Sequence, residues 1–140
     1  MIDFRSDTVT HPSPQMREAI SKAQIGDDVF GDDPSINSLE EMAADKLGKE
    51  RALFVASGTM GNLVSILAHS NRGDEIIVGN KSHIFKYEAG GASALGGVAY
   101  HTVENKDDGK ICPEDVLNAI RDSSDNHNPK TSMIALENTQ

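Results

Sequence analysis

The sequence predicts an α/β protein with a mostly parallel sheet and helices on both faces. Short apolar runs at 52–56, 75–79, 98–103 and 132–136 lack the alternation of half-exposed strands, as expected for strands covered on both sides. Segments with apolar residues at helical spacing, and turns rich in Gly and Asp, separate these runs. Strands that alternate with helices are typical of parallel sheets built from βαβ units.

Two helices are predicted before the first of these strands. Ser13 has the character of an N-cap with Pro14 in the first helical position, and Asp33 with Pro34 repeats the arrangement. Gly48 would end the second helix. The predicted inner faces comprise Met16, Ala19, Ile20 and Ala23 in the first helix and Ile36, Leu39, Met42, Ala43 and Leu47 in the second. We therefore separate an N-terminal segment, residues 1–48, from a sheet-containing part, residues 49–140.

The stretch from residue 52 to residue 67 passes from an apolar strand into an amphipathic helix. Ser57, Gly58 and Thr59 lie at the junction, and the helix has Met60, Leu63, Val64, Leu67 and Ala68 at helical spacing. The free amides and positive dipole of such a helix favour an anion, above all a phosphate, and Gly58 has no Cβ to obstruct it. On this stretch alone a simpler interpretation stays open, in which Ser57 is an N-cap and Gly58 a turn residue.

The same sequence signals predict the elements after residue 70. Residues 71–74 form a turn before the strand 75–79, so that this strand and 52–56 would be a parallel pair. The small residues 89–97 indicate closely packed backbone near a second subunit. A helix from Pro113 would turn Val116, Leu117 and Ile120 inward, and the polar loop 122–129 leads to the last strand.

Polar residues follow the ends of several predicted strands. His83 comes shortly after the strand 75–79, and Glu137 and Asn138 follow the last strand. Ligands of open α/β sheets bind at the carboxyl edge. We therefore expect the imidazole, these polar groups and the phosphate seat at residues 57–60 to converge on one site.

Composition excludes several classes of function. The chain has 140 residues and a net charge of −9, which argues against binding to nucleic acid. We find no run long enough for a membrane span and no signal peptide. The single Cys112 suits a reducing compartment, so we expect a cytoplasmic protein. The carboxylates at 27–33 lack EF-hand spacing, and helix capping by Asp33 is favoured over a metal site.

Six motifs in register resemble the low-specificity L-threonine aldolases, pyridoxal-phosphate enzymes of the beta-eliminating lyase family with the aspartate-aminotransferase fold (fold type I). The motifs are RSDTVT at 5–10, GDDVFGDDP at 26–34, SGT at 57–59, His83, EAGG at 88–91 and ENT at 137–139. The resemblance covers all 140 residues and identifies them as the N-terminal portion of such an enzyme. Residues 49–140 would be the first part of its large, cofactor-binding domain.

The resemblance implies a cofactor site in this large domain. Ser57, Gly58, Thr59 and Met60 would bind the phosphate of pyridoxal 5′-phosphate. His83 would stack on the cofactor ring and also act as a catalytic base near the substrate hydroxyl. The implied activity is cleavage of L-threonine or L-allo-threonine to glycine and acetaldehyde.

The resemblance also implies roles in substrate binding. Ser6 would lie near the substrate carboxylate, Phe30 would form a wall of the site, and His127 would contact the substrate hydroxyl as a second catalytic residue. The only partner expected besides this small amino-acid substrate is further copies of the chain, because the family forms homotetramers. We expect no metal ion, nucleic acid or membrane as a partner.

The chain departs from the family pattern at two positions. Phe30 replaces a frequent Tyr, and Gln140 stands where His is usual. The lysine that binds the cofactor covalently, the aspartate for its ring nitrogen and the arginines for the substrate carboxylate would all follow Gln140. We therefore expect the 140 residues alone to be inactive.

Three alternatives remain from the residues themselves. Another pyridoxal-phosphate lyase or transferase of this fold could act on a different amino acid. A non-catalytic phosphate-binding domain would need no lysine. A nucleotide-binding module is disfavoured, because no GxGxxG or GK[ST] motif follows a predicted strand.

Overall fold

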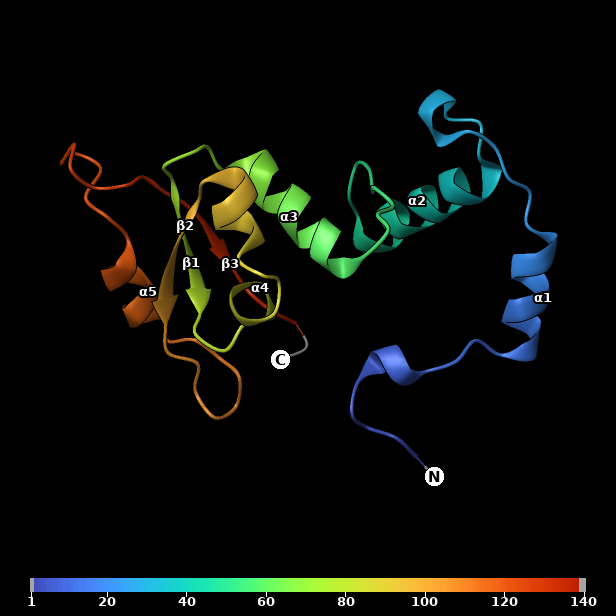
Figure 1. Ribbon diagram of the computed structural model, residues 1–140, viewed down its shortest axis with the longest axis horizontal. Coiled ribbons are helices and arrows are strands. Elements are labelled where there is room, and N and C mark those ends of the chain that lie inside the picture. Colours follow the sequence, from blue (N-terminus) through green and yellow to red (C-terminus); the bar gives the residue numbers. More distant parts are fainter. Residues whose placement is uncertain (1, 139–140) are drawn as a thin grey trace. The chain divides into compact units, whose positions relative to one another are not determined.

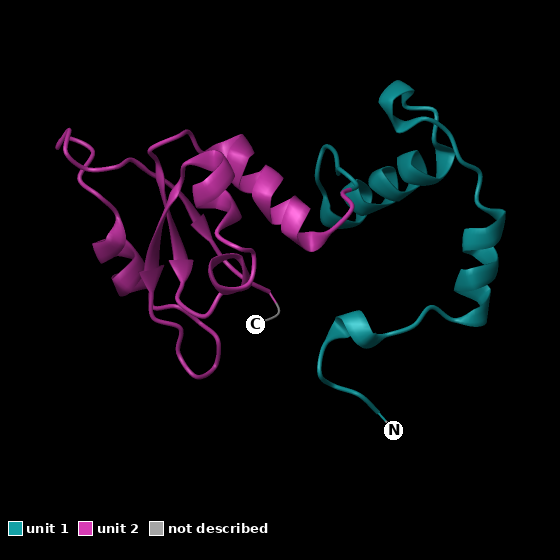
Figure 2. Ribbon diagram, in the orientation of Figure 1, with its two compact units in different colours: residues 1–54 teal, residues 55–140 magenta. Residues whose placement is uncertain are grey.

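The computed structural model describes residues 2–138 of the chain. It divides into two compact units, Met1–Phe54 and Val55–Gln140, which Figure 2 distinguishes by colour. The sequence suggests a division several residues earlier, after Gly48, and that domain assignment stays a prediction. No helix in the described part of the chain is long and apolar enough to cross a membrane.

Unit 1 consists of helices joined by irregular segments. Its elements are the short 3-10 helices η1 (Asp7–Val9) and η2 (Asp28–Phe30) and the α-helices α1 (Pro14–Lys22) and α2 (Pro34–Leu47). Ser13 Oγ accepts a hydrogen bond from Met16 N at 3.2 Å at the start of α1. The Asp33 carboxylate accepts from Ser35 N at 2.9 Å and Ile36 N at 3.0 Å, and Gly48 ends α2 with a φ of 62°. The two predicted helices and their caps are confirmed.

The predicted inner faces of α1 and α2 are largely wrong. Met16 and Ile20 of α1 are exposed, as are Leu39, Met42 and Leu47 of α2. Ile36 and Ala43 are half-buried, and Ala44 is the buried residue of α2. An amphipathic helix buries its apolar face only against another element. Within the described residues of unit 1, no sheet covers these faces.

Unit 2 is built around a parallel sheet (Figure 1). The central strand β1 (Glu75–Gly79) has β2 (Ala99–Val103) on one side and β3 (Thr131–Ala135) on the other. Ile77 of β1 is in register with His101 of β2 and Ile134 of β3, and both pairings are parallel. All of β1 is buried. The parallel sheet that the continuous apolar runs predict is thus confirmed.

Helices cover both faces of this sheet. On one face, Ile76 and Val78 pack with Ile66 of α3 (Gly58–His69) and with η3, a π-helical segment at Ala92–Gly96. On the other face, Ile77 packs with Val116 and Ala119 of α5 (Pro113–Ala119). The predicted α/β class, with helices on both faces of a parallel sheet, is therefore confirmed.

The predicted strand at 52–56 is wrong. These residues have no regular secondary structure, and Leu53 and Phe54 are exposed. A strand requires a neighbour that takes up its backbone N–H and C=O groups. The described sheet contains only β2, β1 and β3, so α3 follows an irregular segment and the parallel neighbours of β1 lie later in the chain.

Two predicted helix faces are rotated from the observed ones. Ile66 is the buried residue of α3, whereas Met60, Leu67 and Ala68 are exposed. In the segment around α5, Leu117 and Ile120 are exposed, and Ala119 is buried beside Val116. The apolar residues of α3 occupy more than one face of the helix, so their spacing alone does not identify the side that packs.

Candidate functional site

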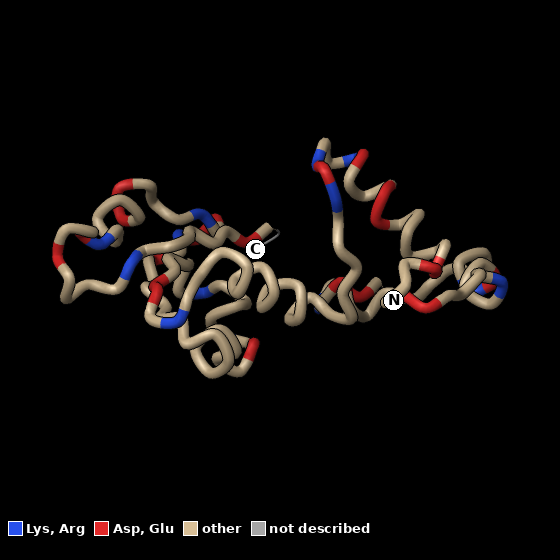
Figure 3. Tube along the Cα trace, turned by 90° about the horizontal axis from the view of Figure 1, so that it is seen from above, with Lys and Arg blue, Asp and Glu red and all other residues tan. Residues whose placement is uncertain are grey.

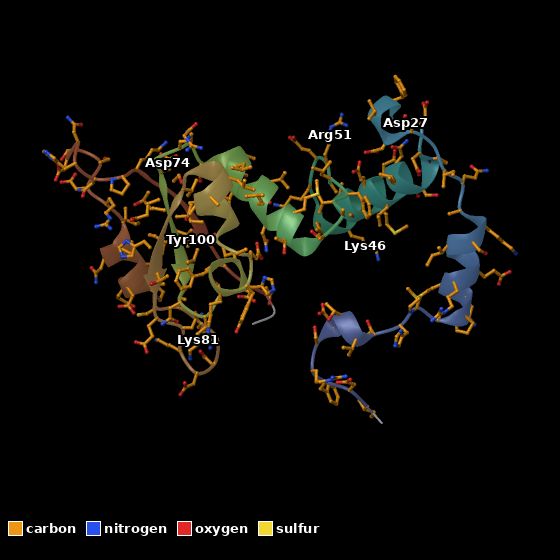
Figure 4. All side chains as sticks on the ribbon, in the orientation of Figure 1. Asp27, Lys46, Arg51, Asp74, Lys81 and Tyr100 are labelled. Atoms are coloured by element: carbon orange, nitrogen blue, oxygen red, sulfur yellow. The ribbon has the colours of Figure 1, made fainter. Side chains whose placement is uncertain are left out.

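The connection from β1 to α4 (His83–Lys86) is fixed at the carboxyl edge of the sheet. Ser82 Oγ donates a hydrogen bond to Gly79 O at 2.7 Å, and Asn105 Oδ1 accepts one from Lys81 N at 2.8 Å. Ser82 and Asn105 are both buried. Figure 4 labels Lys81 at this edge and Asp74 at the opposite end of β1. His83 therefore follows the carboxyl end of β1, as the sequence predicts.

His83 is anchored by two carboxylates. Its backbone N donates to Glu137 Oε2 at 2.9 Å, and its Nδ1 lies 2.7 Å from Glu88 Oε1. The ring of Tyr87 lies 5.6 Å from the imidazole, between centroids. The His83 side chain is nevertheless 53% exposed. A fixed imidazole with an accessible surface can pack against a flat ligand and exchange a proton with it.

Glu88 connects the imidazole to α3. Its side chain is only 6% exposed, and its Oε1 also accepts a hydrogen bond from Asn62 Nδ2 at 2.7 Å. Asn62 follows Thr59 by about one turn of the same helix. The hydrogen-bonded series Asn62–Glu88–His83 therefore links the beginning of α3 to the imidazole within one unit.

The beginning of α3 has free donors for an anion. Ser57 Oγ accepts from Met60 N at 3.1 Å, so the N-cap interpretation of Ser57 is confirmed. The amides of Gly58 and Thr59 lie in the first helical turn and have no acceptor within the helix. A Cβ built on Gly58 would meet nothing within 4 Å. This open position, with two amides and the helix dipole, fits a phosphate group.

A cavity lies next to the hydrogen-bonded series. It has a volume of about 360 Å³ and is lined by residues of α3, by Ser82 and His83, and by the segment that follows β3. Asn62, Ile66 and Glu137 are among the lining residues. Cavities of this size hold small ligands. His83 is the imidazole available to such a ligand.

A larger cavity of about 770 Å³ lies on the other face of the sheet. Its walls include Val116, Ile120, Ile134 and Leu136, and no histidine lines it. Asp108 and Glu137 also line this cavity, so its candidate proton acceptors are carboxylates. His83, the imidazole expected from the sequence, lines the smaller cavity and not the larger one.

The structure does not bring His127 near His83 within one chain. His127 lies in the loop before β3, its side chain is 95% exposed, and its Nδ1 is 2.9 Å from Asp125 Oδ1. Hydrogen bonds from the backbone N–H and the side chain of His127 lower the pKa of Asp125. Because β1 and β3 are parallel, the loop before β3 and the connection after β1 lie at opposite edges of the sheet.

Ser6 and Phe30 belong to unit 1. Ser6 Oγ accepts from Thr8 N at 3.2 Å and caps η1. Phe30 is exposed at the end of η2, before Gly31 with a φ of 69°. Their predicted positions beside the substrate stay predictions. Thr139 and Gln140, including the departure from the family pattern at Gln140, lie outside the described residues.

The amino edge of the sheet has a different kind of cluster. Arg121 Nε donates to Glu75 Oε1 at 2.9 Å, Arg121 Nη2 donates to Glu75 Oε2 at 3.1 Å, and His101 Nδ1 lies 3.1 Å from Glu75 Oε1. The bonds from Arg121 lower the pKa of Glu75, which burial alone would raise. Figure 3 shows acidic and basic residues interspersed along the trace. The Glu75 cluster joins β1 and β2 to the end of α5.

Sequence reasoning identified His83 and Glu137, but it did not identify the contact of Glu88 with the imidazole or that of Asn62 with Glu88. Asn62 is polar and lies on the packed side of a mostly apolar helix, yet it could be recognised only once that side was known. Glu88 follows His83 by five residues and belongs to the EAGG motif. Its contact with the imidazole depends on the turn of the chain after α4, which spacing does not reveal.

Comparisons with known proteins identify the family of this chain. The beta-eliminating lyase family model matches residues 3–140. The chain is 51% identical over 140 residues to low-specificity L-threonine aldolase 1 of Arabidopsis thaliana, covering 99% of this chain and 39% of that protein. It is 46% identical over 139 residues to the low specificity L-threonine aldolase of Escherichia coli K12, covering 99% and 41% respectively.

A further relative has a different printed activity. The chain is 37% identical over 138 residues to the alanine racemase TOXG of Cochliobolus carbonum, covering 98% of this chain and 36% of that protein. The chain thus spans roughly two fifths of the length of the curated relatives it matches. Since the family model extends over nearly all of its residues, this chain belongs to the beta-eliminating lyase family.

Proposed function

We propose that this chain is the N-terminal part of a pyridoxal-phosphate-dependent aldolase that cleaves L-threonine or L-allo-threonine to glycine and acetaldehyde. The observation that carries the proposal is the half-exposed His83 imidazole beside a cavity of about 360 Å³, linked through Glu88 and Asn62 to a helix start with free amides. A base that is joined by hydrogen bonds to the helix whose start would hold the phosphate supports this reaction. The relatives named as threonine aldolases support the choice of substrate.

The residues present fit the cofactor. The amides of Gly58 and Thr59 would bind its phosphate, helped by the hydroxyls of Ser57 and Thr59, and Gly58 leaves room for close approach. Met60 would contribute the third residue of that turn. His83 would lie against the ring. Bound pyridoxal phosphate supplies an electron sink for the electron pair that is released when the Cα–Cβ bond breaks.

The part of this chain in the reaction is the transfer of one proton. His83 would accept the proton of the substrate β-hydroxyl while the C–O bond becomes the carbonyl of acetaldehyde and the Cα–Cβ bond breaks. The same proton can then be released to solvent, since more than half of the imidazole is exposed, and Cα would take up one proton to give glycine. General-base assistance of this kind contributes about 10² to 10⁴ in rate.

The other predicted substrate contacts extend this proposal. Ser6 would bind the substrate carboxylate, and Phe30 would supply an aromatic wall without the hydroxyl of tyrosine. His127 lies at the edge of the sheet opposite to His83. We propose that His127 reaches the substrate hydroxyl from a neighbouring copy in a homotetramer, which agrees with the expected assembly. We also propose that the protein is cytoplasmic.

A chimera tests the activity directly. The 140 residues replace the matching segment of the Escherichia coli aldolase, which is 46% identical to them, so that the relative supplies the rest of the chain. We expect release of acetaldehyde and glycine from threonine, whereas the 140 residues alone should give neither. His83→Gln in the chimera should lower kcat by about 10² or more, while His69→Gln, at the far end of α3, should not. A folded chimera that binds the cofactor but does not cleave threonine would refute the proposal.

The alanine racemase relative supports a second candidate function. At 37% identity over 138 residues, that protein shares nearly the whole matched segment, so the segment itself is compatible with chemistry on another amino acid. The conversion of L-alanine to D-alanine, measured beside threonine cleavage, separates the two activities. Racemisation without acetaldehyde would favour the second candidate. A phosphate-binding domain without catalysis would show neither.

A further inference from the structure

Glu88 is a buried carboxylate that the proposed reaction does not yet use. Its side chain is 6% exposed, and its Oε1 lies 2.7 Å from both His83 Nδ1 and Asn62 Nδ2. We infer that Glu88 is a positioning residue that fixes the proton of neutral His83 on Nδ1, so that Nε2 has the free lone pair. The catalytic meaning of this inference rests on the proposed function, in which Nε2 would accept the hydroxyl proton.

The donor and acceptor chemistry supports one tautomer. An ionised carboxylate accepts hydrogen bonds and donates none, and the Asn62 amide nitrogen only donates. Two donors therefore meet at Glu88 Oε1, and His83 Nδ1 must be one of them. A neutral imidazole has a proton on only one of its two nitrogens. If a hydrogen bond holds that proton on Nδ1, Nε2 is the acceptor.

Burial makes this arrangement costly to lose. A carboxylate that is withdrawn from water needs partners, because an unpaired buried charge is strongly disfavoured. The described residues supply Asn62 and His83, and no arginine or lysine bonds to Glu88. The hydrogen bond with His83 is therefore a large part of what compensates for the burial of Glu88.

The backbone conformation after Glu88 supports a fixed position for this residue. The next residue, Ala89, has a φ of 52°, and Gly90 has a φ of 66°. Ala89 is the non-glycine residue with positive φ among those described. Such a conformation costs of order 1 kcal/mol or more and persists only where the surroundings hold it. Gly91 N donates to Glu88 O at 3.0 Å and closes this turn.

Nitrogen-15 NMR of the histidine side chains tests the inference on the 140-residue chain. Long-range proton–nitrogen spectra, recorded above neutral pH and assigned with a His83→Gln variant, identify which ring nitrogen of His83 bears the proton. In the native protein we expect a protonated Nδ1 and an unprotonated Nε2. In Glu88→Gln the amide can donate as well as accept, so we expect at least half of the signal to shift to the opposite tautomer.

Glu137→Gln is the matched control. Glu137 also bonds to His83, at 2.9 Å, but through the backbone N–H and not through the ring. This variant should keep the proton on Nδ1. A native spectrum with the proton on Nε2, or a spectrum that Glu88→Gln leaves unchanged, would overturn the inference. Circular dichroism of each variant excludes loss of fold as the cause of a spectral change.

The measurement distinguishes this inference from the proposed function. It needs neither cofactor nor substrate, so a protonated Nδ1 that depends on Glu88 stands even if the chimera does not cleave threonine. Conversely, if the chimera cleaves threonine but the proton of His83 lies on Nε2, the proposed aldolase function stands and the positioning role of Glu88 is refuted.

Discussion

The two edges of the sheet each contain a buried glutamate bonded to a histidine, yet the two pairs differ in what surrounds them. At the amino edge, the side chains of Glu75 and His101 are 6% and 28% exposed, and Arg121 donates two hydrogen bonds to the same carboxylate. At the carboxyl edge, the side chain of Glu88 is equally buried, its second donor is the neutral Asn62, and its histidine partner is 53% exposed.

Under the proposed function, this difference separates a structural pair from a functional one. Glu75 has a cation as its main partner, and bidentate arginine pairs are strong and directional. The cluster therefore needs no contribution from His101 to stay ionised. Glu88 has no such cation among the described residues, and its hydrogen-bond partners are the neutral Asn62 and the exposed imidazole of His83. A protonatable group that is accessible and lies beside a cavity is suited to chemistry, whereas an enclosed one stabilises the fold.

Matched substitutions by glutamine should reveal this difference in stability. Glu75→Gln removes the charge and places amide hydrogens opposite the Arg121 donors, so we expect the free energy of unfolding to fall by about 2 kcal/mol. Glu88→Gln keeps an oxygen for Asn62 or His83, and we expect a loss of about 1 kcal/mol or less. Urea denaturation of both variants measures the two values. A larger loss for Glu88→Gln would contradict the assignment of the two edges.

The pH dependence of stability should isolate the amino edge. The pKa of Glu75 lies below its ordinary value of 4.5 in the folded protein. Its contribution to stability is therefore complete above about pH 4.5 and is lost as the pH falls through the lowered pKa. The difference in unfolding free energy between the native protein and Glu75→Gln should shrink between pH 6 and pH 3. A constant difference over this interval would show that Arg121 does not hold the ionised form.

The sequence predicts the central strand of this sheet well because its apolar run is continuous and fully buried. Ile76, Ile77 and Val78 are completely buried, and the strand from Glu75 to Gly79 has the predicted bounds. The failure at 52–56 has a physical cause. Apolar composition shows that a segment can be a strand, but hydrogen-bonding partners decide whether it is one. Leu53 and Phe54 have no such neighbour in the described chain.

The sequence predicts which backbone positions form the site better than it predicts the contacts between their side chains. Ser57 and His83 follow from local signals, a helix start and a strand end. The bond between Glu88 and Asn62 joins residues 26 positions apart and depends on which side of α3 packs. His127, a residue matched by motif, lies at the edge opposite to His83 within one chain, and its predicted contact with the substrate stays a prediction. Distance along the sequence does not report which edge a loop occupies.

Gly79, at the carboxyl end of β1, and Gly58, at the start of α3, should respond differently to alanine. A Cβ at Gly79 would lie 2.3 Å from Asn105 Oδ1, in the side chain that fixes the turn before His83. Gly79→Ala should therefore destabilise the protein by about 1.5 kcal/mol through overpacking. Gly58→Ala meets nothing within 4 Å and should leave the unfolding free energy unchanged or raise it by up to about 0.5 kcal/mol. It should still weaken binding of pyridoxal phosphate, measured by spectroscopic titration. Equal stability losses would contradict this division.

The smallest expected effect concerns the strain beside Glu88. Ala89→Gly relieves a positive φ of 52° but gives the unfolded chain more freedom, and these two contributions oppose each other. We expect a net gain of up to about 0.5 kcal/mol in thermal or urea unfolding. Ala94→Gly, in the following π-helical segment, is the matched control and should lose about 0.5 to 1 kcal/mol, because Ala94 has no positive φ to relieve. A clear loss in Ala89→Gly would mean that the alanine methyl packs favourably there, and the conformation of the turn would then not be a source of strain at the carboxyl edge.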